Sequence, residues 1–221
     1  KLVHPEWEKQ IVFDFKSVPI VSIENPTYYY QVVEELYQQT EGKEGFFVLS
    51  DDGEVLDFRK HVQLLVSPWT MDFSTAVVTK RLCNRLQEEA NNEQHYMKTK
   101  EVMHHVLSYL QELEQELPMP LTYDWNPDVA NLFKAVHVQV DTSDLNVMEK
   151  MIEYMKLWTE LFGKTCFIFN QFRTYLPKSM RKEVYTCAME EEIPFLLLEG
   201  ACHDTIEQES CLIIDEDLCQ I

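Results

Sequence analysis

Glycine is scarce in this sequence, with only five glycines among 221 residues. A loop that cradles nucleotide phosphates needs closely spaced glycines and a lysine at the start of the next helix, in the pattern GxxxxGK[ST]. The pattern occurs nowhere in the chain, whose glycines are Gly42, Gly45, Gly53, Gly163 and Gly200. Nucleotide hydrolysis of the phosphate-loop type is therefore excluded.

Long apolar runs and paired cysteines are also missing. The sequence contains no run of about eighteen apolar residues, so we expect no membrane span, and the first residues lack the apolar stretch of a secretion signal. The six cysteines include no CxxC pair, which argues against a cysteine-held zinc site. With 45% hydrophobic and 12% aromatic residues, the chain can bury a substantial core. A soluble, cytoplasmic globular protein is expected.

Positive charge is scarce and is sorted along the chain. The formal net charge is −19, and no Lys or Arg follows Lys182. Residues 59–100 hold 7 basic and 4 acidic side chains, and residues 134–182 hold 8 basic and 5 acidic ones. Residues 101–133 hold 6 acidic side chains and no Lys or Arg. Such a chain is either a solvated acidic globule or a protein that gathers its few cations on one surface.

Four apolar runs predict the strands of a mostly parallel sheet. They cover residues 18–23, 166–170, 195–199 and 211–214, and a helix is expected between the second and third of them. Continuous apolar strands joined through helices indicate a sheet covered on both faces. We expect further strands at 11–15, 46–49 and 136–140. Asn25 followed by Pro26 predicts a helix that runs to about Thr40.

A helical segment interrupts this α/β pattern. Apolar residues spaced three and four apart predict helices after Asp72 and again up to Leu117, and Asn126-Pro127 indicates the start of a short helix. We therefore predict a discontinuous α/β head at 1–66 and 134–221, with an NTPase-like sheet but no phosphate-binding loop. Residues 67–133 are predicted to form an inserted α-helical leg.

Acidic side chains gather near the predicted elbow of the leg. Glu112 and Glu116 are four residues apart on a helix, and Asp124 and Asp128 follow shortly after the turn at Pro118–Pro120. Converging carboxylates suit calcium, which accepts six to eight oxygen ligands in flexible geometry. The other interpretation is a solvated acidic face. Glu199, at the end of an apolar strand, is interpreted as a strand-end carboxylate rather than a catalytic group.

Several short motifs occur along the chain in a particular order and spacing. They are Phe46-Phe47, Leu65-Val66-Ser67, Asp72-x-Ser-Thr with Lys80, Tyr123-Asp124, Phe169-Asn170 with Tyr175-Leu176, Leu197-Leu198-Glu199 and Asp215-Glu216-Asp217. In this order and spacing, and over nearly the whole chain, they resemble one protein family: the ring-forming, double-stranded-DNA-binding accessory protein of type II-A CRISPR adaptation.

The resemblance implies a homotetrameric ring that threads linear duplex DNA and binds its ends during spacer acquisition, a part of antiviral defence. It further implies no enzymatic activity, calcium (Ca2+) at the hinge between head and leg, and the integrase subunits and RNA-guided nuclease of the same system as partners. Members of the family carry further acidic residues on both sides of the Tyr-Asp pair, where this chain has Thr122 and Trp125. Asp124 is therefore the principal calcium candidate, and Asp128, Glu116 and Glu112 are substitutes.

Lysine and arginine contacts to phosphates would provide DNA binding without sequence preference. The candidate residues are Arg59, Lys60, Lys80, Arg81, Lys134, Lys150 and Lys156. Two alternatives stay open. One is a metal-dependent nuclease that uses the elbow carboxylates or Glu199, and the other is an acidic scaffold that binds the integration machinery through protein contacts.

Overall fold

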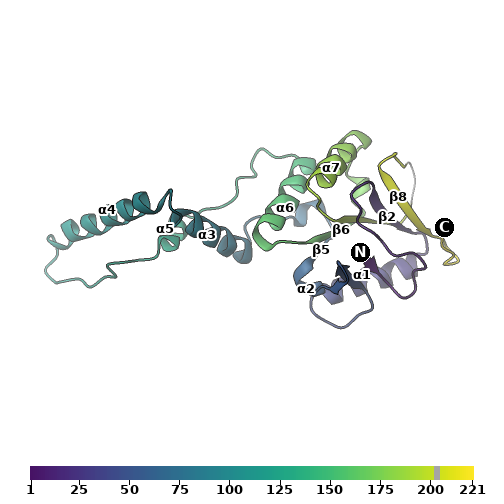
Figure 1. Cartoon of the computed structure of the whole chain (residues 1–221), viewed down its shortest axis with the longest axis horizontal. Coiled ribbons are helices and arrows are strands. Elements are labelled where there is room, and N and C mark those ends of the chain that lie inside the picture. The colour runs from purple at the N-terminus through teal and green to yellow at the C-terminus, as the bar shows by residue number, and fades with distance from the viewer. Residues whose placement is uncertain (202–204) are drawn as a thin grey trace. The chain divides into compact units, whose positions relative to one another are not determined.

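The computed structural model describes residues 1–201 and 205–221, which divide into two compact units (Figure 1). Unit 1, the head, comprises Lys1–Asp72 and Thr142–Ile221, and unit 2, the leg, comprises Phe73–Asp141. The leg is thus inserted into the head, as expected, but its bounds lie after the predicted 67 and 133. The 3-10 helix η1 (Pro68–Thr70) and the buried Met71 belong to the head.

A five-stranded parallel sheet forms the centre of the head. The strand order is β5-β6-β7-β2-β8. The bounds are β2 Val18–Ile23, β5 Val62–Leu65, β6 Cys166–Asn170, β7 Phe195–Glu199 and β8 Glu209–Ile214. Every residue of β2 is buried, as a strand covered on both faces requires. The prediction of an α/β fold around a mostly parallel sheet is therefore confirmed.

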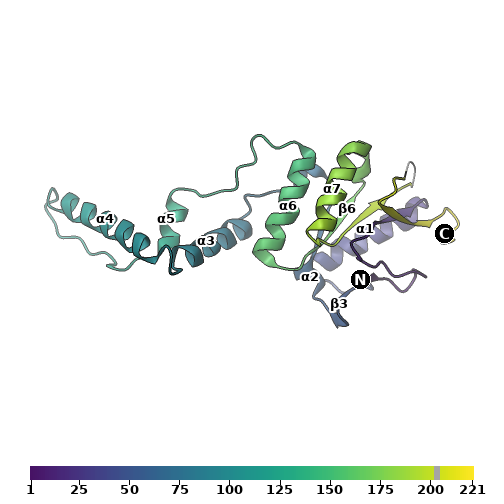
Figure 2. The same ribbon diagram turned by 45° about the horizontal axis from the view of Figure 1, so that its top comes forward.

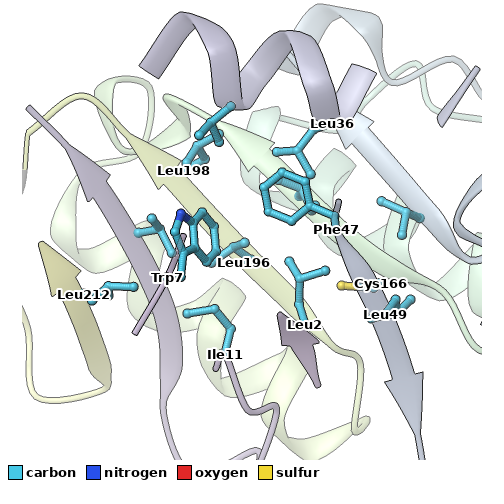
Figure 3. Packing of buried hydrophobic residues seen from close by; sticks show 14 of the residues in the cluster. Leu2, Trp7, Ile11, Leu36, Phe47, Leu49, Cys166, Leu196, Leu198 and Leu212 are labelled. Atoms are coloured by element: carbon cyan, nitrogen blue, oxygen red, sulfur yellow. The ribbon is translucent and has the colours of Figure 1, made fainter. Parts of the chain in front are cut away.

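Helix α1 (Pro26–Thr40) and the N-terminal residues cover one face of this sheet. Val32 and Leu36 of α1 pack with apolar residues from all of the strands. Figure 3 shows Trp7, Phe47 and Leu2 filling the space between α1 and β7, whose Leu196 and Leu198 point toward them. Asn25 caps α1, and its Oδ1 accepts hydrogen bonds from the N–H groups of Thr27 and Tyr28, both at 3.0 Å.

Helices α6 (Val147–Phe162) and α7 (Lys178–Glu190) cover the opposite face and lie side by side in both ribbon views (Figures 1 and 2). Aromatic pairs join them to the sheet. The rings of Tyr154 and Phe167 are 6.3 Å apart, and those of Tyr185 and Phe195 are 5.8 Å apart. Such contacts add to the free energy gained by burying the rings.

A small antiparallel sheet, of order β1-β3-β4, adjoins α1. Its strands are β1 Leu2–Val3, β3 Val48–Asp51 and β4 Glu54–Val55, and the short helix α2 (Phe58–His61) follows. Gln39, in the last turn of α1, is buried, and its side chain forms hydrogen bonds with the backbone of Phe47, just before β3. Its amide donates to the Phe47 carbonyl and accepts from the Phe47 N–H, both at 3.0 Å.

The leg contains α3 (Ala76–Ala90), α4 (Tyr96–Glu114) and α5 (Val129–Ala135). Val78 and Cys83 form the buried face of α3, and Val129 and Ala130 are the buried residues of α5, which packs against α3. Helix α4 buries only Leu107. The described chain contains no helix long and apolar enough to cross a membrane.

Several local predictions were wrong. Thr75, rather than Asp72, caps α3, and α5 begins after Asp128 rather than at Asn126-Pro127. Residues 136–140 form no strand, and only Ile11 of the predicted 11–15 strand pairs, as an isolated bridge to Leu2. Both segments have an apolar pattern that is typical of a strand. Neither pairs over its length with another strand in the described structure, and a strand forms only with a hydrogen-bonded partner.

Replacing Gln39 tests how the small sheet is held. We expect Gln39→Ala to lower the free energy of unfolding by about 2–3 kcal/mol, because it leaves the N–H and carbonyl of Phe47 buried without their partner. Urea unfolding followed by circular dichroism measures this. Gln31→Ala, at an exposed position of the same helix, is the control and should change stability by less than about 0.5 kcal/mol. Equal stability of the two variants would contradict the bridging role.

Candidate nucleic-acid interface

Lys80 and Arg81 lie on the solvent-exposed side of α3, opposite the buried Val78 and Cys83. The Thr75 side chain fixes the start of this helix, since its Oγ1 accepts a hydrogen bond from the Val78 N–H at 3.2 Å. Because side chains three and four residues apart share one helix face, the exposed face extends from Lys80 to Asn84. The local sequence therefore places two adjacent cations on a rigid element of the leg.

Lys134 lies in the last turn of α5 and is exposed. Helix α5 packs on α3, so this lysine belongs to the same unit as Lys80 and Arg81. A cation in the last turn also interacts favourably with the helix dipole. The leg thus brings three of the seven predicted DNA contacts onto two packed helices.

The other four candidates lie on the head. Arg59 and Lys60 are exposed on α2, and Lys150 and Lys156 are half-buried on α6. Lys60 Nζ is 3.2 Å from a carboxylate oxygen of Asp57, and Lys156 Nζ is 3.4 Å from one of Glu191. An adjacent carboxylate offsets part of the attraction of a lysine for phosphate, so Lys60 and Lys156 are the weaker candidates.

Ion pairing separates the stronger candidates from the rest. Within the described ranges, Lys80, Lys134 and Lys150 form no ion pair. A cation without a carboxylate partner can exchange its counterion for a phosphate directly. Lys80 and Lys134, which are both exposed, are therefore the strongest candidates for such a contact.

The sequence analysis missed Arg85, which lies one helical turn beyond Arg81 and is also exposed. The four-residue spacing of the two arginines would have identified it. Its guanidinium is 3.4 Å from Glu88 and 3.1 Å from Glu89, so it is a partly neutralised extension of the cationic face of α3.

The predicted calcium ligands are not brought together. The side chain of Lys100, near the start of α4, donates to Asn126 Oδ1 at 2.8 Å, whereas Glu114, at the end of α4, accepts from the Leu121 N–H at 2.7 Å. These two points are separated by about 21 Å of helix at 1.5 Å per residue. Asp128 therefore lies toward the start of α4, and Glu112 and Glu116 lie at its far end. Asp124 lies on the returning segment between them, next to Tyr123, whose hydroxyl donates to Glu114 Oε2 at 3.4 Å.

Asp124 and Asp128 have backbone partners instead. Asp124 Oδ1 accepts from the Asn126 N–H at 2.9 Å. Asp128 Oδ1 caps α5 through the Ala130 N–H at 2.9 Å and accepts from the Gln87 amide at 2.8 Å. Over the residues described, no group of three or more metal-ligating side chains converges. The donor set expected for calcium does not fit a calcium cage here, because hydrogen bonds and distance keep its members apart.

The carboxyl end of strand β2 has no room for a phosphate-binding loop. Only Glu24 and Asn25 separate β2 from α1, and the Asn25 side chain already binds two N–H groups of the first turn. A phosphate loop would use these groups for its ligand. Glu199, at the end of β7, accepts a hydrogen bond from the Arg173 N–H at 3.0 Å, which agrees with its interpretation as a strand-end carboxylate.

These features define an α/β head of NTPase-like topology that lacks the phosphate loop and carries an inserted helical leg. The family described as CRISPR-associated protein (Cas_Csn2) matches residues 39–218. The chain therefore belongs to the Csn2 family of CRISPR-associated proteins, which gives it a role in CRISPR adaptation.

Several solved structures match the fold, and one of them serves as an example. It is the crystal structure of Stu0660 of Streptococcus thermophilus, with a TM-score of 0.60, 8% sequence identity, and coverage of 100% of this chain and 75% of that chain. At this identity the likeness concerns the fold alone. No curated protein matches the sequence.

Substituting Asp128 distinguishes a capping role from a metal-binding role. We expect Asp128→Ala to lower the free energy of unfolding by about 1–2 kcal/mol, because α5 loses its N-cap. The loss should be the same in EDTA and in millimolar calcium. Asp128→Asn keeps a capping oxygen and should stay near the wild-type value. Thermal unfolding in both buffers is the measurement, and a loss of stability confined to the calcium buffer would indicate a metal ligand.

Proposed function

We propose that the protein binds duplex DNA without sequence preference and without catalysis, inside a homotetrameric ring, during spacer acquisition. The observation that carries this proposal is the exposed cationic surface of the leg, formed by Lys80 and Arg81 on α3 and Lys134 on α5. A chain of net charge −19 repels polyanions elsewhere, so a phosphate backbone would be attracted mainly to such a surface.

The energetics follow from the release of counterions. Each lysine or arginine that replaces a counterion on B-form DNA steepens the salt dependence of binding by about 0.9 on a log–log scale. With about two phosphate contacts per subunit and four subunits, the slope is on the order of −7. Modest cationic surfaces on each copy therefore add up to useful affinity only when several copies assemble.

An unpartnered apolar stripe on α4 supports assembly. Val102, Val106, Tyr109 and Leu113 share one face of the helix, with spacings of four, three and four residues, and are 40%, 38%, 60% and 44% exposed. Exposed apolar stripes of this kind are typical of protein–protein contacts. A second copy of the chain would bury this stripe and bring further cationic surfaces to the same DNA.

The proposal contains no catalytic step. A metal-dependent nuclease would need carboxylates that converge on its ions, and Asp128 lies apart from Glu112 and Glu116 along α4. Linear DNA with free ends is the proposed ligand, and the integrase subunits and the RNA-guided nuclease are the proposed protein partners. Calcium remains a prediction from the resemblance, and no step of the proposal depends on it.

Removing one leg lysine tests the DNA contact. We expect Lys80→Ala to weaken binding to a short linear duplex and to reduce the log–log salt slope from about −7 to about −3.5, because one contact is lost per subunit. Gel shifts between 50 and 200 mM salt measure both. Lys43→Ala changes the net charge equally at an exposed head position and should leave the slope unchanged.

The same gel shifts separate the alternatives. Closed-circular duplex should compete poorly with linear duplex if the ring is threaded over ends. Equal competition and an unchanged slope for Lys80→Ala would contradict the proposal. Cleavage of the duplex in magnesium or manganese would indicate the nuclease, and salt-insensitive association with the integrase without any shift of DNA would indicate the protein scaffold.

A charge within the α4 stripe tests assembly. We expect Val106→Glu to convert the homotetramer into smaller species, because burying an unpaired carboxylate in an interface is costly, while the exposed position leaves the subunit folded. Light scattering measures the mass, and circular dichroism checks the fold. Gln111→Glu, on the opposite side of α4, should leave the mass unchanged. A Val106→Glu variant with the wild-type mass would exclude this stripe as the contact.

A further inference from the structure

A cavity of about 460 Å³ opens in the leg, between the last turns of α3, the first half of α4 and the segment that leads into α5. Figures 1 and 2 show that this segment runs back along α4 to reach α5. Lys100 Nζ donates to Asn126 Oδ1 at 2.8 Å, and Gln87 Nε2 donates to Asp128 Oδ1 at 2.8 Å. These two hydrogen bonds hold the segment against both helices. The cavity therefore lies within one unit, and its volume falls within the range of small-molecule sites.

Trp125 gives the cavity an aromatic wall. This residue lines the cavity and is 63% exposed, and its ring centroid lies 5.0 Å from that of Tyr123. Met103 and the buried Leu107 of α4 add apolar surface to the lining. Exposed aromatic rings are the surfaces on which unpaired nucleobases stack, and such stacking accepts all four bases because each has a flat face. The cavity therefore offers a flat ring a place to stack.

Carboxamide groups give the cavity its hydrogen-bonding capacity. The side chain of Asn91, Oε1 of Gln87 and Nδ2 of Asn126 form no hydrogen bond with the residues that the structure describes. A carboxamide carries an acceptor and a donor in one plane, which matches the edge of a nucleobase. In a duplex the Watson–Crick partner occupies that edge, so only an unpaired base can present it to a protein.

Opposite charges occupy different parts of the lining. Lys100 belongs to α4 and forms no ion pair within the described ranges. Asp128, just before α5, is the only carboxylate among the lining residues. A carboxylate repels phosphate but accepts a hydrogen bond from the amino group of a base, whereas a lysine contacts the phosphate backbone. The lining is therefore suited to a base with its attached phosphate rather than to a simple anion.

One stripe of α3 connects the cavity to Lys80, the proposed phosphate contact. Lys80, Asn84, Gln87 and Asn91 are spaced by four, three and four residues, so they share one side of the helix. Gln87 lies about 10 Å beyond Lys80 along the helix axis, at 1.5 Å per residue. A DNA strand advances about 3.4 Å per nucleotide. A strand that contacts Lys80 and follows this stripe therefore reaches the cavity about three nucleotides further on.

We infer that the cavity receives an unpaired base at the end of a bound DNA strand. Trp125 is the stacking surface, and the carboxamides of Gln87, Asn91 and Asn126 meet the edge of the base. This inference rests on the proposed DNA binding, because Lys80 must first hold the strand. It adds a ligand to that proposal, namely a single-stranded overhang, which the protein distinguishes from a blunt end by its bases.

Duplexes that differ only at their ends test this inference. One duplex is blunt, a second carries three-nucleotide overhangs, and a third carries overhangs of the same length without bases. Overhangs are placed on the 3′ strands in one set and on the 5′ strands in another. We expect fluorescence anisotropy with an internal dye to show that, in at least one set, overhangs with bases bind at least about fivefold more tightly than abasic ones. Equal affinity for both overhangs in both sets would overturn the inference.

Three variants locate the effect. Trp125→Ala should bind base-bearing and abasic overhangs equally, while its affinity for blunt duplex stays unchanged. Trp125→Phe keeps an aromatic ring and should retain most of the gain. Trp69→Ala removes another exposed indole, 73% exposed on the head, and should retain all of it. Circular dichroism checks the fold of each variant. A full gain in Trp125→Ala, or an equal loss of affinity for blunt and overhanging duplex, would overturn the role of Trp125.

Two further outcomes separate this inference from its alternatives. Free deoxynucleoside monophosphates, at the same concentration as the overhangs, should leave the gain intact. If they abolish it, the cavity is a site for free nucleotides, and the assignment to a strand end is overturned. If wild-type protein does not bind blunt duplex, the proposed function fails and this inference fails with it. If blunt duplex binds and the bases of the overhang have no effect, only this inference fails.

Discussion

The parallel sheet of the head must be covered on both faces, and the rest of the structure depends on this constraint. A strand such as β2, buried along its whole length, requires helices on both sides. Helix α1 and the N-terminal segment cover one face, and α6 and α7 cover the other. The leg is inserted between β5, an edge strand, and α6. The insertion therefore leaves the hydrogen-bonded order of the strands intact.

The positively charged side chains of the leg and two arginines of the head differ in their burial. The exposed cations of the leg lie on α3, α4 and α5, whereas Arg173 and Arg181 are buried and contact Glu209 inside the head. The first kind can exchange counterions for phosphates along a polymer. The second kind is held in place by ion pairs inside the head.

Elements with a clear local signal, such as a helix cap or a continuous apolar run, could be predicted from the sequence. The helix that begins after Asn25 and the strands at 18–23 and 195–199 lie where the sequence analysis expected them. Residues 136–140 have the alternation of a strand but no partner strand, and no local pattern records that. The absence of a phosphate loop could also be predicted, because the glycines of its pattern must lie close together in the sequence.

Sites that depend on tertiary distance were not predictable in the same way. Glu112 and Asp128 are close in sequence across the elbow, yet the returning segment runs back along α4 and separates them. Conversely, Arg173, Arg181, Glu199 and Glu209 lie far apart in sequence, and the sheet brings them together. Spacing along the chain carried no signal for that cluster.

The two-residue link between β2 and α1 has a consequence for how this head could change over time. A phosphate-binding motif of the GxxxxGK[ST] type occupies about eight positions, and Glu24 and Asn25 provide two. Point substitutions alone could not restore ATP or GTP turnover. Such turnover would need an insertion of about six residues between β2 and α1, where the chain now passes directly from the buried strand into the capped helix.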